Sequence, residues 1–306
     1  MRIFRSIEEA AGIKNPVVTT GSFDGVHIGH KTILNRLKML ATKYNGESVL
    51  ITFDPHPRKV LYPETVGKDL KLINSQEEKL ILLQKAGLNN LIIVNFTKEF
   101  SKITSEEFVR DYLHNILKAK VVVAGFNHQF GFNKEGDYKH LWDWREKYDF
   151  EAEEIPEQEV QHETVSSTKI RKAISEGYIQ RANAYLDHYY IIMGRPEPVF
   201  PDLPSGLPSF LKIPVMEECK ILPSPGIYAV SAVSDEDISK GMAIIHPVMD
   251  GSSEVLLNIF EDEEKFAGKI STLLFHKKIY GSVNLTDSNS SYRVNTAKAE
   301  IAELIF

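Results

Sequence analysis

The feature that most constrains the fold is a regular alternation of strand-like and helix-like segments along residues 16–186. Between the strand-like runs, apolar residues recur at helical spacing, as they do in residues 33–41. Strands that alternate with helices predict βαβ units, and hence a Rossmann-like parallel sheet with helices on both faces. The predicted strands are residues 17–23, 48–53, 91–94, 121–124 and, at an edge of the sheet, 151–155.

Local signals predict where several of these helices begin and end. Ser75 with Glu78, and Thr104 with Glu107, have the spacing of capping boxes, in which side chains satisfy the free amides of a helix start. Gly177 interrupts the helical segment 167–186 and predicts two short helices there.

The pattern changes after Tyr189. Residues 195–225 contain eight of the chain's 14 prolines, and proline lacks the amide donor that helices and ladders need. We therefore expect an extended or looped stretch, followed by a small antiparallel β-barrel built from short, evenly spaced β-rich runs. These considerations predict two domains, residues 1–186 and 187–306; the runs of the second are 227–233, 242–247, 254–259 and 269–275.

Composition excludes several classes of function. The net charge of −6 offers no general attraction for nucleic acid or for an anionic membrane. The longest apolar runs fall far short of the roughly 20 residues of a membrane span. Cys219 is the single cysteine, which excludes an internal disulfide and a multi-cysteine zinc site. With no apolar stretch at its start, the chain is expected to lack a signal peptide and to be cytoplasmic.

The most informative motif is the segment 21–30, Gly-Ser-Phe-Asp-Gly-Val-His-Ile-Gly-His. Its three glycines follow a predicted strand and allow main-chain amides to approach a ligand closely. The helix that is expected to begin near His30 adds free amides and a positive dipole end, which favour phosphate. His27 and His30 are three residues apart, so they can face one side of the first turn. The alternative interpretation is a glycine turn with two surface histidines.

A second motif, Ser-Ser-Thr-Lys-Ile-Arg at 166–171, opens another predicted helix. Ser166 or Ser167 can cap this helix, and Thr168 adds a hydroxyl group. Arg171 supplies cationic donors suited to a polyphosphate. An ordinary helix cap followed by solvated charges is the alternative interpretation.

Two polar loops follow other strands. Asn127 lies in the glycine-rich loop 122–137, and the carboxyl ends of parallel strands form the ligand crevice in this architecture. Asn127 could position a substrate or could close a turn. In the loop 51–57, Phe53, His56 and Pro57 could contact a planar ring or could simply pack. No Ser/His/Asp or Cys/His nucleophile pattern is present in the sequence.

Taken together, these motifs resemble the HxGH-type nucleotidylyltransferases. In this longer form they resemble the bacterial riboflavin kinase/FMN adenylyltransferase family, the FAD synthetases. The similarity covers residues 15–194 and keeps the family's motifs in order: 21–30, 52–57, 125–131 with 136–137, 166–171, and the domain junction at 182–194.

The resemblance implies transfer of AMP from ATP to FMN, giving FAD and pyrophosphate, with Mg²⁺. His27, His30, Asn127 and Arg171 would be catalytic. Phe53, His56 and Pro57 would lie toward the flavin. The nucleotide-binding residues would be Gly21, Phe23, Asp24, Gly25, Gly29, Ser166, Ser167 and Thr168.

The second half departs from the family pattern. Where a riboflavin kinase domain has a glycine-rich loop and then Gly-Phe-Pro-Thr-Ala-Asn, this chain has Glu197 and several prolines, Pro201 among them, then Ser209 and Leu211. Leu211 stands where asparagine is expected, while Glu254 falls at the position of the family's catalytic glutamate. The family's carboxy-terminal helix pair is expected to be shortened to residues 295–306. We therefore expect a retained barrel with a degenerate kinase site.

Four functions remain open at this point. The first is an FMN adenylyltransferase with a degenerate kinase-like domain, and the second is the full bifunctional enzyme. The third is a non-catalytic flavin- or nucleotide-binding regulatory protein, which the retained His27, His30, Asn127 and Arg171 disfavour. The fourth is an adenylyltransferase for another substrate, which the flavin-side loop disfavours.

Overall fold

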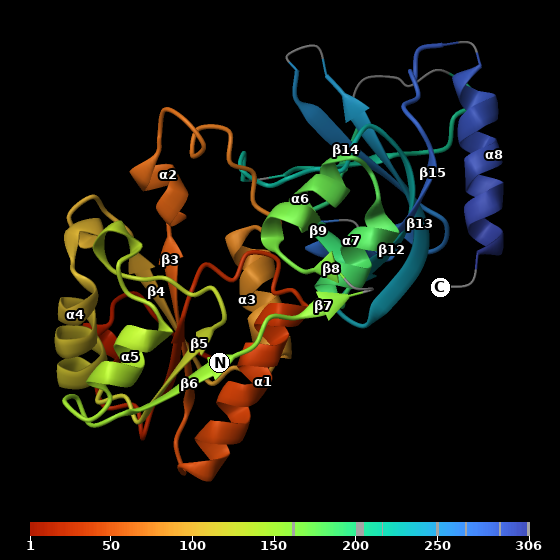
Figure 1. Ribbon diagram of the computed structural model, residues 1–306. Helices are drawn as coiled ribbons and strands as arrows, with labels where there is room; N and C mark the ends of the chain where they lie inside the picture. The colour runs from red at the N-terminus through yellow and green to blue at the C-terminus, as the bar shows by residue number, and fades with distance from the viewer. Residues whose placement is uncertain are drawn as a thin grey trace. The chain divides into compact units, whose positions relative to one another are not determined.

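The computed structural model describes residues 1–160, 163–199, 205–215, 217–248, 251–266, 268–287 and 289–304. The chain divides into two compact units (Figure 1). The first contains residues 1–70 and 79–165, and the second contains residues 71–78 and 166–306. Pro201 of the proline-rich stretch lies outside the described residues.

The first unit is built on a six-stranded parallel sheet, which confirms the predicted Rossmann-like architecture. The strand order is β1-β4-β3-β2-β5-β6, so the chain moves outward from β2 in one direction and then places β5 on its other side. The carboxyl ends of β2 and β5 therefore flank the switch point of the sheet, where ligands bind in such folds. The strands are β1 (Arg2–Phe4), β2 (Val17–Thr20), β3 (Ser48–Asp54), β4 (Asn90–Asn95), β5 (Val121–Gly125) and β6 (Glu151–Ile155).

Alternate residues of these strands enter two separate cores, one on each face. Val17 and Leu50 pack with Leu34 and Leu37 of helix α1 (Ile28–Lys43), whereas Val18 packs on the opposite face. This alternation follows from the two-residue repeat of a strand and requires helices on both sides of the sheet. Helix α3 (Gln76–Lys85) contributes to the first core. The second core is covered by α4 (Ser105–Glu107), the π-helical segment η3 (Phe108–Ile116) and α5 (Tyr138–Trp144).

Both predicted capping boxes are present. The Ser75 hydroxyl accepts the Glu78 amide at 3.2 Å, and the Glu78 carboxylate accepts the Ser75 amide at 3.0 Å. Thr104 and Glu107 make the same reciprocal pair at the start of α4. The first unit also contains the short helix α2 (Pro57–Leu61) and the two-stranded ladder of β7 (Glu159–Val160) and β8 (Glu163–Thr164).

The second unit contains a curled, seven-stranded antiparallel sheet, which confirms the predicted barrel-like domain in the form of a half-barrel. Its core includes Ile227, Met242 and Ile244, and Val294 and Ile301 of helix α8 (Ser290–Glu303) pack against them. In spatial order the strands are β10 (Glu197–Pro198), β11 (Leu211–Ile213), β14 (Ser253–Ile259), β13 (Asp237–Pro247), β12 (Gly226–Ser234), β15 (Ser271–Tyr280) and β9 (Tyr190–Gly194).

Helices α6 (Ser167–Ser175) and α7 (Ile179–Leu186) are separated at Gly177, as predicted. They belong to the second compact unit, and the Asn183 side chain donates to the Phe275 carbonyl of β15 at 2.8 Å. The domain boundary at 186/187 stays a prediction of the sequence. Helix α8 (Ser290–Glu303) is longer than the expected carboxy-terminal segment because it begins five residues earlier.

The segment 71–78 is held within the second unit by a buried ion pair. Lys220 donates to the Glu78 carboxylate at 2.5 Å and to the carbonyls of Ile73 and Ile191, and both charged side chains are at most 2% exposed. The second carboxylate oxygen of Glu78 accepts the Met193 amide at 3.0 Å. Burial of a charge requires such partners, and here the ammonium and the carboxylate are both extensively hydrogen-bonded.

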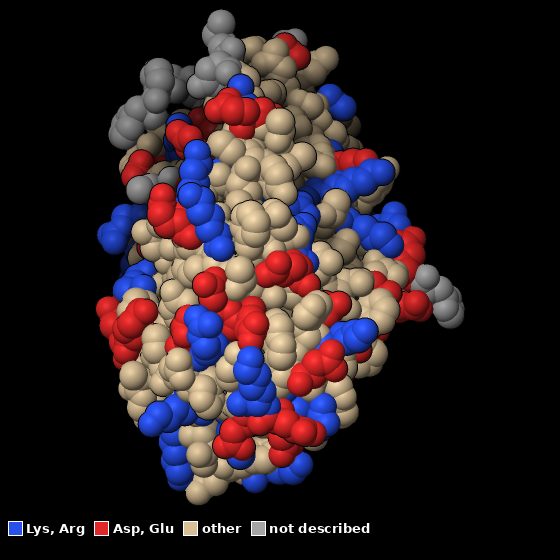
Figure 2. Space-filling view, turned by 60° about the vertical axis from the view of Figure 1, so that its left-hand side comes forward, with Lys and Arg blue, Asp and Glu red and all other residues tan. Residues whose placement is uncertain are grey.

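Figure 2 shows one face of the molecule, on which the Lys and Arg side chains of the described residues are interspersed with those of Asp and Glu. This face therefore has no extended field of one sign. Any attraction for an anion on this face has to come from a local arrangement of donors.

Candidate active site

The turn after β2 is a strained strand-to-helix connection. Phe23 and Val26 have φ values of 48° and 42°, in the left-handed region that side chains rarely adopt. For a β-branched residue such as Val26 this is an unusual conformation, and such strain is concentrated at functional sites. Gly25, with φ of 93°, has no such penalty. Because the turn begins at Gly21, strand β2 ends at Thr20, earlier than the sequence pattern suggests.

His27 and His30 are brought together by the first turn of α1. Their rings stack with centroids 3.7 Å apart, as their spacing predicts, and the Phe23 ring stacks on His30 at 4.4 Å. His27 occupies the N-cap position, so the helix begins at Ile28 rather than near His30. A side chain at Gly29 would place its Cβ 3.2 Å from the His27 ring, which explains why glycine suits this position.

The environment keeps His30 uncharged. Burial lowers the pKa of His30 well below 6.5, and the nearby His27 and Lys79 lower it further. The Nδ1 atom of His30 has no hydrogen-bond partner among the described residues. A neutral imidazole at a helix N-terminus is a hydrogen-bond donor for an anion, beside the free amides of the first helical turn.

Two residues that sequence reasoning missed hold this turn in place. The Ser22 carbonyl accepts a hydrogen bond from the Thr52 hydroxyl of β3 and another from the Lys79 ammonium of α3, both at 3.3 Å. Thr52 lies in the 52–57 motif but was not assigned a role. Lys79 gave no signal beyond its place in a helical pattern, because its contact is with a turn 57 residues earlier in the chain.

The loop after β5 lies at the other side of the switch point. Asn127 is exposed in this loop, and the following His128 contacts Thr20 at the end of β2, with 3.2 Å between Nε2 and Oγ1. Burial lowers the pKa of His128 to about 4, so this contact involves a neutral imidazole. This contact therefore links the end of β2 to the loop after β5. It connects the glycine turn, which follows β2, with the loop that contains Asn127.

Several other positions of this motif have structural partners. Phe130 and Gly136 exchange two backbone hydrogen bonds that close the loop, and the Asp137 carboxylate caps α5 by accepting the His140 amide at 3.1 Å. A side chain at Gly136 would collide with Ser105. These contacts explain the spacing of Phe130, Gly136 and Asp137 without a ligand, and Asn127 is among the exposed polar residues of the loop.

The end of β3 and the loop after it are packed and capped within the first unit. The Phe53 ring packs edge-on against Phe96 at 5.4 Å. His56 caps α2 by accepting the Arg58 amide at 3.1 Å, and Pro57 is the first residue of that helix. These three predicted flavin-side residues therefore also have packing and capping contacts.

The motif 166–171 lies in the second unit, at the start of α6. Ser166, rather than Ser167, is the N-cap, and its hydroxyl accepts the Lys169 amide at 3.4 Å. Arg171 donates to the Thr168 hydroxyl at 3.2 Å. The cap and the guanidinium group therefore present hydroxyl and cationic donors from one helix end.

The predicted kinase-like residues of the second unit have other partners. Glu254 forms an ion pair with Lys212 at 3.1 Å. Leu211 is buried in β11 opposite Leu257 of β14, and the Ser209 hydroxyl donates to Glu263 at 3.1 Å. The proline-rich stretch is not wholly looped, because β10 pairs with β11.

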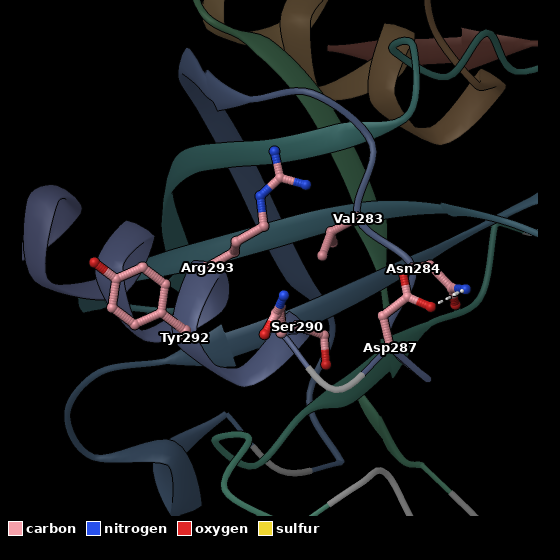
Figure 3. Close-up of a pocket in the computed structure, with 7 residues that line it drawn as sticks. Val283, Asn284, Asp287, Ser290, Tyr292 and Arg293 are labelled. Atoms are coloured by element: carbon pink, nitrogen blue, oxygen red, sulfur yellow. Dashed lines mark hydrogen bonds between the residues drawn. The ribbon is translucent and has the colours of Figure 1, made fainter.

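A wide hollow of about 650 Å³ also lies in the second unit, at the start of α8. In Figure 3 the hydrogen bond between Asn284 and Asp287, 2.8 Å long, lies on one side, and Tyr292 and Arg293 extend from the helix. Tyr292 is 76% exposed, so the hollow is open to solvent. It shares no residue with the four sequence motifs.

Among the described residues, no three His, Cys, Asp or Glu side chains are grouped so that they could hold a metal ion. Magnesium is in any case bound largely through substrate phosphates and water rather than through a cage of protein ligands. In the described part of the chain, no helix is both long and apolar enough to cross a lipid bilayer.

The parallel sheet, the glycine turn at its switch point and the stacked histidine pair at a helix N-terminus define a nucleotidyltransferase. Residues 10–169 match the family model of the FAD synthetases. This chain belongs to the FAD synthetase family.

Two curated relatives and one solved structure are similar to this chain. A bifunctional riboflavin kinase/FMN adenylyltransferase of Listeria monocytogenes is 31% identical over 269 residues, which cover 87% of this chain and 81% of the relative. An FAD synthetase of the same organism is 36% identical over 178 residues, 58% of this chain and 71% of the relative. The crystal structure of a macrolide-efflux protein from Streptococcus pneumoniae is similar with a TM-score of 0.84 over 99% of both chains; at 22% identity this likeness shows the fold alone.

Proposed function

We propose that this chain is an FMN adenylyltransferase that transfers AMP from ATP, supplied as its magnesium complex, to FMN. The observation that carries the proposal is the stacked pair of His27 and His30 at the N-terminus of α1, beside the switch point of the parallel sheet. Family membership supplies the substrates. Both substrates are small molecules of the cytoplasm, where we place the enzyme.

The reaction is an in-line displacement at phosphorus. An oxygen of the FMN phosphate attacks the α-phosphorus of ATP, a new phosphoanhydride bond forms, and the bond to the leaving pyrophosphate breaks. The attacking oxygen is already anionic, so positioning and charge stabilisation contribute more than covalent catalysis does. The neutral imidazole of His30 and the ring of His27, with the amides of the first turn, donate to the oxygens on which charge develops.

The other predicted residues have supporting roles in this proposal. Asn127 positions the reacting phosphates from the β5 loop. Ser166, Ser167, Thr168 and Arg171 bind phosphate oxygens of ATP, and the flavin lies against the loop of Phe53, His56 and Pro57. The backbone of Gly21, Phe23, Asp24, Gly25 and Gly29 shapes the nucleotide site.

We further propose that the second unit does not phosphorylate riboflavin. A kinase needs donors for the β- and γ-phosphates and oxygen ligands for a metal ion. Leu211 offers no oxygen and is part of a ladder, Ser209 is bonded to Glu263, and Glu254 is paired with Lys212. Glu254 alone could accept a proton from the flavin hydroxyl. Without a bound phosphate whose charge is neutralised, however, that hydroxyl would have no phosphoryl group to attack.

One experiment tests both statements. The purified protein is incubated with magnesium and ATP and either FMN or riboflavin, and the flavins are separated by chromatography. FAD is expected from FMN, and no FMN from riboflavin. A well-folded protein that makes no FAD contradicts the adenylyltransferase assignment. Riboflavin conversion at a rate comparable to that of FMN shows the full bifunctional enzyme instead.

A further inference from the structure

Helix α3 places a lysine beneath the glycine turn. Lys79 is only 6% exposed, although lysine is among the residues least often buried. Removing an ammonium group from water is costly unless the protein supplies partners. One partner is the Ser22 carbonyl, 3.3 Å from the ammonium nitrogen.

The carbonyl that Lys79 contacts lies at the point where the turn is most constrained. Ser22 precedes Phe23, whose φ is positive, and Phe23 in turn stacks on His30. The same carbonyl accepts the hydroxyl of Thr52, a residue that is 1% exposed. Two donors from different elements, β3 and α3, therefore fix the peptide that leads into the stacked rings.

The charge of Lys79 also acts on the histidine pair. Two titratable groups exert an electrostatic effect on His30: His27 from the same helix end, and Lys79 from α3. The third close neighbour, the Phe23 ring, does not titrate. Both titratable neighbours oppose protonation of His30, in the same direction as its burial does.

We propose that Lys79 is a positioning residue of the adenylyl-transfer site, whose buried ammonium group fixes the Ser22 carbonyl and places a positive charge close to the His27–His30 pair. This inference rests on the proposed function. It assigns the site a fixed cation that does not need to be delivered with the substrate. This charge also adds to the effects of burial and of His27, which lower the pKa of His30, so that the imidazole enters the reaction as a hydrogen-bond donor with a constant protonation state.

The first test is independent of activity. The Cε1–H resonance of His30, assigned by its loss in His30→Gln, is followed by NMR during a pH titration of the free protein. In Lys79→Met the titration of His30 is expected to move to higher pH, because a positive charge has been removed. Lys79→Arg keeps the charge and is expected to leave the titration in place. Lys85→Met, at an exposed position of the same helix, is the matched control.

Lys79→Gln covers the case in which Lys79→Met does not fold, and it retains an amide donor for the Ser22 carbonyl. An unchanged His30 titration in either neutral variant, with native circular dichroism, overturns the proposal. This readout does not require the protein to make FAD, so it separates failure of the inference from failure of the proposed function.

The second test is the pH profile of kcat/KM for FAD formation, which reports groups of the free enzyme. The neutral variants are expected to lose about tenfold or more in kcat/KM, as expected for a misplaced reacting group. In these variants the acidic limb of the kcat/KM profile is expected to move to higher pH. A uniform loss at every pH, with no shift of the acidic limb, would show that Lys79 has a packing role only.

Discussion

The Thr20 hydroxyl and the His128 imidazole are in contact at the switch point of the parallel sheet, 3.2 Å apart. Thr20 is the last residue of β2, directly before the glycine turn, and His128 directly follows Asn127. This contact fixes the distance between the two loops that the proposed reaction requires to act together. The Phe130 ring stacks on His128 with centroids 5.8 Å apart and holds the imidazole in place.

Breaking this contact is expected to impair catalysis without removing a catalytic group. His128→Phe keeps the stacking on Phe130 but removes the ring nitrogens, and we expect kcat/KM for FAD formation to fall about tenfold, because small displacements of reacting groups are costly. Thr20→Val should have a similar effect, and the double variant should be no worse than either single one. Additive losses in this cycle would show that the two residues act separately.

His30→Ala is expected to reduce kcat by about 10²–10³, the usual effect of removing one donor from a site that stabilises developing negative charge. The KM for ATP should change little, since this donor acts mainly in the transition state. Steady-state kinetics with varied ATP measure both constants. A raised KM with an unchanged kcat would show that His30 only binds substrate.

Stability is expected to fall as the solution becomes acidic. The pKa of His30 is well below 6.5 and that of His128 is about 4 in the folded protein, because burial disfavours the charged imidazole. Below pH 6.5 the unfolded chain therefore binds more protons than the folded one, so the free energy of unfolding is greatest above this pH and decreases toward pH 4. Urea denaturation between pH 6.5 and about 5 measures the slope, in a range above the ordinary carboxylate pKa. The slope of the unfolding free energy against pH should be smaller in His128→Phe than in the unmodified protein. Equal slopes in the two proteins would assign the effect to other groups.

The buried pair of Lys220 and Glu78 provides a test of stability in the second unit. Lys220→Met leaves a carboxylate buried without its ammonium partner, and such a loss costs about 3–5 kcal/mol. Urea denaturation measures the change, and Lys220→Met combined with Glu78→Gln is expected to recover part of it. Lys212→Met is the matched control, because its half-exposed pair with Glu254 should contribute no more than about 1 kcal/mol. Equal effects of the two single variants would contradict the assignment.

Local patterns were sufficient to predict much of the fold. The alternation of apolar strand-like runs such as 48–53 with helical patterns, and the capping boxes at Ser75 and Thr104, predicted the layers and the helix starts, because these signals depend on neighbours in the sequence. Strand β1 was missed, since three residues form no periodic pattern. Strands β10 and β11 were missed because prolines argue against a ladder, although proline is tolerated at its edge.

In the candidate site, too, local features could be predicted and contacts between distant residues could not. His27 and His30 were predicted to face one side of a helical turn, and their rings stack. By contrast, Lys79, Thr52 and His128 depend on how α3, β3 and the β5 loop pack around the turn. Such contacts between distant parts of the chain leave no mark in a single sequence. The roles that the family resemblance assigns to Asn127 and Arg171 stay predictions.

The pairing of β10 with β11 has a consequence for the behaviour of the protein in concentrated solution. An open antiparallel sheet has edges whose free backbone groups can recruit a strand from another molecule, which is a route to aggregation. Strand β10 forms one edge of the half-barrel, and both of its residues are exposed: Glu197 brings a negative charge, and Pro198 has no amide to offer. The charge of Glu197 and the ring of Pro198 therefore protect this edge of the sheet against self-association.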